Sequence, residues 1–245
     1  MPTAIETCQH AAPRRARIAV TLGDPSGIGP ELAAKLLSNN ANLERADIVL
    51  LADNSELQSA IQDAGGVQVT VTTGRPGPHG VQVLDDNTAS QYPSVRGEVS
   101  KASGARCMYQ LKRALKLVQA GEIDGIVFAP LNKSSLKLAG MTEEDELRWF
   151  ANQLDFRGTT SEINIAGPLW TGRVTSHIGL EEVAERITKE RTLRAIGLLQ
   201  RLRYVYNPSS RSPAFQPVYT HTIHHTKVGI RHRFSTVRSL RIEPS

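Results

Sequence analysis

The sequence has few cysteines and no long apolar segment. Its 245 residues include only two cysteines, Cys8 and Cys107, so we expect neither a disulfide framework nor a cysteine metal site, and a reducing cytoplasm fits. No run of about 18 apolar residues occurs, so we expect no membrane-spanning helix. Residues 1–16 lack the apolar core of a signal peptide, and we interpret them as a loose leader. We therefore expect a cytoplasmic protein without a membrane partner.

Most of the chain has no excess of positive charge. The formal net charge is +5, but residues 1–203 contain 23 basic and 23 acidic residues, whereas residues 204–245 contain six basic residues and one acid. This C-terminal segment is rich in Ser, Arg, His and Pro without a sustained apolar period, so we expect it to be disordered. One hypothesis is a nucleic-acid binder that acts through this basic tail. Because aromatic residues are sparse there and the body is neutral, we expect no nucleic-acid partner.

The stretch from Arg17 to Glu31, RIAVTLGDPSGIGPE, predicts a strand, a glycine turn and a helix start. It contains neither a Walker A loop nor the GxGxxG dinucleotide motif. The apolar strand over residues 17–22 stops at Gly-Asp-Pro, and a Pro-Glu pair then suits the first turn of a helix. Gly27 and Gly29 lie in the turn, where backbone N–H groups at a helix N-terminus can hold a phosphate or carboxylate. The alternative is a plain strand–helix connection, for which two glycines are ordinary.

Strands and helices alternate along the chain, which is typical of an α/β fold with a parallel sheet. Strands are predicted over residues 47–52, 67–72, 81–84, 124–129 and 172–177, and helices over residues 30–38, 54–61, 103–120, 141–154, 178–186 and 188–202. The sequence therefore predicts three parts: the leader over residues 1–16, an α/β region over residues 17–203 and the basic tail over residues 204–245.

Polar residues follow two of these strands. Asn132 and Lys133 come just after the strand over residues 124–129, which we expect to be central, and ligands of open α/β sheets bind outside the carboxyl ends of strands. His177 ends the strand over residues 172–177. From the residues alone, His177 is either a metal ligand or a hydrogen-bonded histidine, and Lys133 is either functional or an ordinary helix start.

Four segments of the chain point to a known family. They are GDPSGIGPE, FAPLNKSSLKLAG, RVTSHIGL and ERITKERTLRAIGLL. In this order they resemble the PdxA family, the NAD-dependent 4-hydroxythreonine-4-phosphate dehydrogenases of pyridoxine biosynthesis, over about residues 17–203. The resemblance implies a three-layer α/β/α subunit of the isocitrate/isopropylmalate dehydrogenase-like type, incomplete at its C-terminus, that forms a homodimer. It also implies oxidative decarboxylation of a small phosphorylated hydroxy acid with NAD and a divalent metal, Zn, Mg, Mn or Co.

The resemblance also implies roles for individual residues. His177 matches the first of three metal-binding histidines. Lys133 and Asp24 match positions near the substrate pocket, and we assign them as catalytic groups that handle the proton. Asn132 and Glu146 are assigned to substrate binding.

Two departures from the family pattern lower the expected activity. The segment Asp145-Glu146-Leu147-Arg148 stands where the family has Gly-His-Thr-Glu, and a carboxylate there should repel an anion. We therefore expect a different substrate, either another phosphorylated hydroxy acid or a cyclic diol acid. The Asn-Pro-His-Ala-Gly and His-Asp-Gln-Gly motifs, which carry the other metal histidines, do not occur, as a truncated or frameshifted C-terminal third would produce. Losing metal ligands weakens a site strongly. We expect an impaired dehydrogenase; the alternative is a non-catalytic truncated remnant that keeps the anion-binding turn.

Overall fold

The computed structural model describes residues 15–166 and 169–206. Residues 1–14 of the predicted leader and residues 207–245 of the predicted tail therefore lie outside the described part of the chain. Within the two described ranges, no helix is both long enough and apolar enough to cross a membrane.

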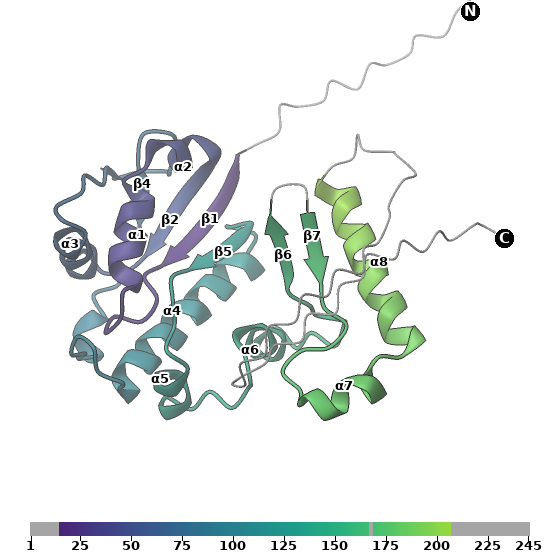
Figure 1. Ribbon diagram of the computed structural model, residues 1–245. Coiled ribbons are helices and arrows are strands. Elements are labelled where there is room, and N and C mark those ends of the chain that lie inside the picture. Colours follow the sequence, from purple (N-terminus) through teal and green to yellow (C-terminus); the bar gives the residue numbers. More distant parts are fainter. Residues whose placement is uncertain (1–14, 167–168, 207–245) are drawn as a thin grey trace, which may run out of the picture. The chain divides into compact units, whose positions relative to one another are not determined.

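The chain divides into two compact units, each described here by itself. The first contains Met1–Glu143 and Asn152–Leu154, and the second contains Glu144–Ala151 and Asp155–Ser245. The elements of the first unit (Figure 1) are β1 (Ala16–Thr21), α1 (Gly29–Leu37), α2 (Asn40–Arg45), β2 (Ala46–Leu51), α3 (Asn54–Asp63), β3 (Val71–Thr72), β4 (Val81–Val83), the short 3₁₀ helix η1 (Ala89–Gln91), α4 (Lys101–Gln119), β5 (Gly125–Phe128) and α5 (Lys133–Leu138).

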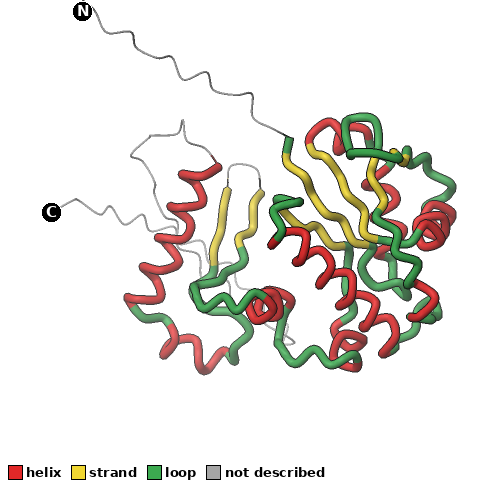
Figure 2. Tube along the Cα trace, turned by 180° about the vertical axis from the view of Figure 1, so that it is seen from behind, coloured by secondary structure: helices red, strands yellow, loops and turns green. Residues whose placement is uncertain are grey.

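The strands of the first unit form one parallel sheet in the order β3-β4-β2-β1-β5. Figure 2 shows its longer strands side by side in yellow. Ile18 of β1 lies opposite Ile48 of β2 on one side and opposite Gly125 of β5 on the other. Parallel neighbours need crossover connections, and helices supply them here except between β3 and β4, which the loop over residues 73–80 joins. The predicted α/β fold with a parallel sheet is confirmed.

Helices cover both faces of this sheet because successive strand residues point to opposite sides. On one face, side chains from β1 and β2 pack against α1 and α3. These are Val20, Leu22, Ile48, Leu50 and Ala52 against Ala33, Leu37 and Leu57. On the other face, Ala19, Val49 and Leu51 pack with Ala114 of α4. Strands buried on both faces explain why the predicted segments are continuously apolar.

Two strand predictions in the first unit need correction. Only Val71–Thr72 of the segment over residues 67–72 pairs with the sheet. The strand predicted over residues 124–129 was expected to be central, but β5 is the last strand in the order, and Val127 is 44% exposed. A short apolar run indicates a strand without indicating how many neighbours it has.

The described part of the second unit contains a two-stranded antiparallel ribbon and three helices. Its elements are α6 (Glu146–Gln153), whose last two residues belong to the first unit, β6 (Ile163–Ala166), β7 (Leu169–Gly172), α7 (Leu180–Arg186) and α8 (Lys189–Tyr206). The strand predicted over residues 172–177 is wrong, because β7 ends at Gly172 and the following residues form a loop. Its β-branched pair, Val174-Thr175, favours strand conformation but has no pairing partner in the described ribbon.

Candidate functional site

The strand order of the sheet reverses beside β1. β2, β4 and β3 lie on one side of β1, and β5 lies on the other. In open α/β sheets, ligands bind outside the carboxyl ends of the strands at such a reversal. Asp24 follows β1, and Asn132 and Lys133 follow β5. The structure thus brings three of the residues predicted from sequence to one edge of the sheet.

The two segments at this edge touch through their backbones. The N–H of Asp24 donates to the carbonyl oxygen of Pro130 at 2.9 Å. Gly23 has φ +73°, and a Cβ on it would lie 2.5 Å from the Pro130 oxygen. Only glycine combines this φ with so close an approach. The Gly-Asp-Pro turn is therefore fitted to the segment that follows β5.

Asp24 is buried and holds the turn together. The residue is 4% exposed, and its Oδ1 accepts a hydrogen bond from the N–H of Ser26 at 2.8 Å. Its carbonyl oxygen accepts from the N–H of Gly27 at 3.0 Å. Both contacts are those of an Asp-stabilised turn. Asp24 therefore has a structural task beside the catalytic one predicted for it.

The predicted anion-binding turn has few donors left. The N–H of Gly27 is taken by Asp24, and Pro30 has no N–H. A Cβ on Gly29 would lie 2.4 Å from the carbonyl oxygen of Leu22, so close packing explains this glycine. Glu31 adds a carboxylate to the first turn of α1, with its pKa lowered by a hydrogen bond and the charge of a lysine one turn later. Anion binding by Gly27 and Gly29 stays a prediction.

Asn132 and Lys133 begin α5. The side-chain oxygen of Asn132 accepts from the N–H of Ser135 at 3.1 Å, which is N-cap geometry. Lys133 is the first residue of the helix and is exposed. Within the described part of the chain its ammonium has no hydrogen-bond or ion-pair partner. Of the three predicted residues at this edge, Lys133 is the one whose charged group is free for a ligand.

Buried serines connect this edge to α4. The hydroxyls of Ser26 and Ser103 are 2.6 Å apart, and the hydroxyl of Ser100 donates to that of Ser103 at 2.9 Å. The N–H of Ser100 donates to the hydroxyl of Ser135 in α5 at 3.2 Å. The network ties the glycine turn, α4 and α5 together. Sequence reasoning missed it because serine spacing alone does not indicate which segments will meet.

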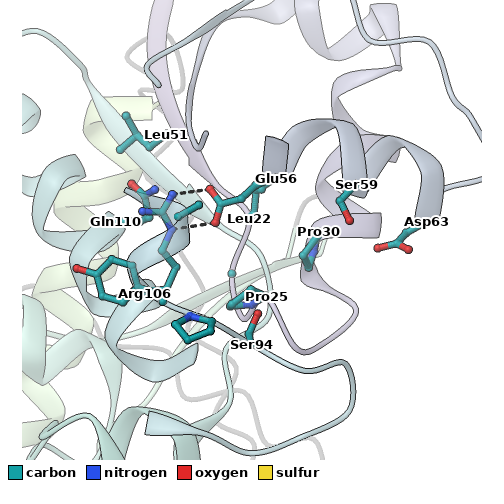
Figure 3. A pocket seen from close by; sticks show the side chains of 14 residues that line it. Leu22, Pro25, Pro30, Leu51, Glu56, Ser59, Asp63, Ser94, Arg106 and Gln110 are labelled. Atoms are coloured by element: carbon teal, nitrogen blue, oxygen red, sulfur yellow. Dashed lines mark hydrogen bonds and ion pairs between the residues drawn. The ribbon is translucent and has the colours of Figure 1, made fainter. Parts of the chain in front are cut away.

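A cavity of about 250 Å³ lies at the carboxyl ends of β1 and β2 (Figure 3). Leu22 and Leu51 give it apolar walls, and Pro25 and Pro30 come from the glycine turn. Gln110 of α4 also lines it, and its buried Nε2 has no hydrogen-bond partner among the described residues. A mainly apolar lining with a few polar groups is typical of small-molecule sites. The GDPSGIGPE turn therefore forms one wall of a cavity.

Arg106 is the buried charge beside this cavity, and sequence reasoning missed it. Its Nε donates to Glu56 at 2.9 Å, and its other nitrogens donate to Asp53 at 3.2 Å and to Thr88 at 2.7 Å. The guanidinium also lies 5.6 Å from the ring centroid of Tyr92. Burial alone would lower the pKa of Arg106, but hydrogen bonds and charge from the two acids raise it above its ordinary value. Because its charge is matched, Arg106 stabilises the cavity wall rather than attracting an anion.

His177 lies in the second unit, where it faces Asp145. The two side chains are 3.5 Å apart between Nε2 and Oδ2, and the histidine side chain is 38% exposed. His177 has φ +55°, an uncommon backbone conformation for a residue other than glycine. Asp145 is buried, and its Oδ1 accepts from the N–H of Arg148 at 2.7 Å, so it caps α6. Glu146, predicted to bind substrate, follows in the first turn of α6.

The described residues do not form a complete metal site. In the two described ranges, no group of three or more His, Cys, Asp or Glu side chains could hold a metal ion. His177 with Asp145 supplies two candidate donors, whereas a protein metal site uses three or four protein ligands. Asp145 is thus the one described carboxylate beside His177 that could share a metal ion with it, and the ligand role of His177 stays a prediction.

The fold and these polar groups define a class: an open α/β protein with a cavity and a candidate ligand site at the carboxyl ends of its strands. The family model described as "Pyridoxal phosphate biosynthetic protein PdxA" matches residues 35–205. The chain belongs to the PdxA family. Three of the four segments that carried the predicted resemblance lie within the matched range.

Relatives support the same placement. The chain is 40% identical over 202 residues to "Putative 4-hydroxythreonine-4-phosphate dehydrogenase 2" of Pseudomonas aeruginosa, covering 77% of this chain and 57% of the relative. It is 34% identical to the D-threonate 4-phosphate dehydrogenase of Bordetella bronchiseptica, covering 77% and 55%. The crystal structure of 4-hydroxythreonine-4-phosphate dehydrogenase from Klebsiella pneumoniae matches with a TM-score of 0.68 at 26% identity, covering 79% and 60%. The chain therefore spans less than two thirds of these proteins.

Proposed function

We propose that the chain descends from a dehydrogenase that oxidises a small phosphorylated hydroxy acid with NAD and a divalent metal, and that it works as a homodimer in the cytoplasm. The observation that carries the proposal is the family match over residues 35–205, which includes Asn132, Lys133 and His177. The names of the relatives, 4-hydroxythreonine-4-phosphate and D-threonate 4-phosphate dehydrogenase, support the substrate class.

In this proposal the edge beside β1 and β5 binds the substrate. Among the described residues the ammonium of Lys133 has no partner, and in this proposal it would pair with an anionic group of the substrate or move a proton. Asp24 lies on the neighbouring segment, where its backbone N–H donates a hydrogen bond to the carbonyl oxygen of Pro130. Asn132 would orient the substrate only through its NH₂ group, because its oxygen caps α5.

The implied cofactors do not fit the described residues, so no reaction step is assigned to them. A metal ion needs three or four protein ligands, and among the described residues only two candidate ligands, His177 and Asp145, lie together. For NAD, the glycine turn offers the pyrophosphate few N–H donors and places Glu31 beside it. We propose that this chain alone is an impaired dehydrogenase.

The incomplete donor set also favours a second candidate, a non-catalytic remnant that binds a small anion and turns nothing over. The two candidates share the binding edge and differ in chemistry. Turnover therefore separates them, and binding tests what they have in common.

The experiment measures both on the purified 245-residue protein. NADH absorbance follows turnover of 4-hydroxythreonine 4-phosphate and D-threonate 4-phosphate with Mg, Mn, Zn or Co, and calorimetry follows binding. We expect binding with very slow NADH formation, and weaker binding by about tenfold in Lys133→Ala. Lys137→Ala is the matched control, since Lys137 is an exposed lysine of the same helix. No binding would refute both candidates, fast turnover would refute impairment, and undetectable turnover with retained binding would favour the remnant.

A further inference from the structure

A second cavity, of about 270 Å³, lies within the second unit and is lined by four arginines. Arg148 comes from α6, Arg173 follows β7, Arg186 ends α7 and Arg191 lies in α8. Arginines that are far apart in sequence thus converge on one small volume. Guanidinium groups bind phosphate and carboxylate oxygens through paired hydrogen bonds.

The acids of the cavity wall do not cancel this charge. Two carboxylates, Asp145 and Glu162, line the cavity against the four arginines, which leaves an excess of two positive charges. Glu162 pairs with Arg173 at 2.6 Å. Asp145 is occupied with capping α6 and facing His177. Glu144 and Glu182 do not line the cavity but pair with Arg148 and Arg186, so the lining becomes electropositive where an anion displaces these two glutamates.

The remaining arginines are weakly held or free. Arg148 and Arg186 pair with glutamates one helical turn away, and both pairs are about half exposed. Such exposed pairs contribute little to stability, so a stronger anion can replace the glutamate. Within the described part of the chain, Arg191 has no carboxylate partner.

Hydroxyl groups complete the lining. Thr160 and Ser161 precede β6, and Thr175 and Ser176 lie in the loop before His177. Each hydroxyl can donate a hydrogen bond to a phosphoryl oxygen without adding charge. A phosphate monoester carries close to two negative charges at neutral pH, which matches the charge of the lining once Glu144 and Glu182 are displaced from Arg148 and Arg186.

We propose that this arginine-lined cavity is a binding site for a phosphate monoester. The identity of the ester rests on the proposed function: it is the phosphate of the small hydroxy acid. The anion site itself rests only on the cavity and its charges.

The first test uses inorganic phosphate as the probe and tryptophan fluorescence as the signal, because Trp149 is next to Arg148 in α6. We expect saturable binding that weakens by about tenfold in Arg191→Gln and in Arg173→Gln. Arg157→Gln is the matched control: Arg157 is in the same unit, its side chain is 85% exposed, and it does not line the cavity. Its affinity should stay within about twofold of wild type.

The outcomes separate this site from the proposed function. Absence of saturable phosphate binding, or an equal loss in Arg157→Gln, overturns the site. Phosphate binding that depends on Arg191 but without any binding of the phosphorylated hydroxy acids keeps the site and refutes the proposed substrate. Binding of those acids that is unchanged in Arg191→Gln refutes the site and keeps the function. Unfolding midpoints of all variants, measured by circular dichroism, show whether a loss comes from misfolding.

Discussion

Replacing Gly104 with alanine tests the packing that positions α5. Gly104 lies in the first turns of α4, and a Cβ on it would lie 1.9 Å from the carbonyl oxygen of Ser135 and 2.8 Å from the N–H nitrogen of Leu136. An ordinary contact begins near 3.4 Å, so α4 and α5 must separate by about 1.5 Å. Both neighbours are backbone atoms, so no side-chain rotation relieves the contact. The helix that begins with Asn132 and Lys133 would then shift as a whole.

The expected cost follows from two opposing effects. Overpacking a buried contact costs about 1–3 kcal/mol, and occasionally more. Replacing glycine by alanine inside a helix returns up to about 1 kcal/mol. A backbone contact as close as that of Gly104 belongs at the upper end of the overpacking range. We therefore expect Gly104→Ala to lower the free energy of unfolding by about 1–3 kcal/mol after the helix term is subtracted.

Urea denaturation followed by far-UV circular dichroism measures this change. Gly197→Ala is the matched control, because Gly197 lies inside α8 and a Cβ on it meets no atom within 4 Å. It should raise stability by up to about 1 kcal/mol. If Gly104→Ala were as stable as wild type, the close approach of α4 to α5 would be refuted. Equal effects of the two substitutions would refute the packing explanation.

Three further predictions concern buried or hydrogen-bonded groups. Arg106→Ala leaves two carboxylates without their cation, so urea denaturation should show a loss of about 3–5 kcal/mol, and an unchanged midpoint would contradict the buried network. Backbone hydrogen bonds lower the pKa of Asp85 below 3.8. The ionised carboxylate therefore stabilises the folded protein above that pH, and this contribution is lost as the pH falls through the folded pKa. On acidification, the unfolding free energy of Asp85→Ala should fall less than that of wild type. Burial raises the pKa of Cys107 to about 12, so in Cys8→Ser a thiol reagent should react only after urea is added, and rapid native reaction would show an exposed thiol.

Some of the fold followed directly from the sequence. The first strand, glycine turn and helix were predicted within one residue of β1 and α1, because glycine and proline restrict the backbone locally. The strand predicted over residues 172–177 was wrong, because Val174-Thr175 favours a strand only when a partner is available, and β7 ends at Gly172. Whether β5 is central or last in the sheet depends on which segments pair with it, and its own residues do not encode that.

The candidate site was predictable to the same degree. Lys133 was placed at the ligand edge because open α/β sheets bind ligands outside the carboxyl ends of their strands, and Asp24 was assigned to the same pocket through the family resemblance. Arg106 was not singled out from the sequence, because a lone arginine in a helix usually faces solvent. Its burial follows from acids about 50 residues earlier in the chain, and a single sequence gives no sign of that pairing. The contact between His177 and Asp145 was missed for the same reason.

The predicted site residues have two kinds of task, and this affects how mutations are interpreted. Asp24 and Asn132, and also Asp145 beside the predicted ligand His177, each accept a backbone hydrogen bond that fixes a turn or a helix start. Losing such a contact costs about 0.5–2 kcal/mol of stability, so reduced activity after their truncation is not by itself evidence of catalysis. Lys133 and His177 make no such contact in the described chain. Chemistry is therefore best tested at these two residues, and at the three capping residues only with substitutions that keep the accepting oxygen.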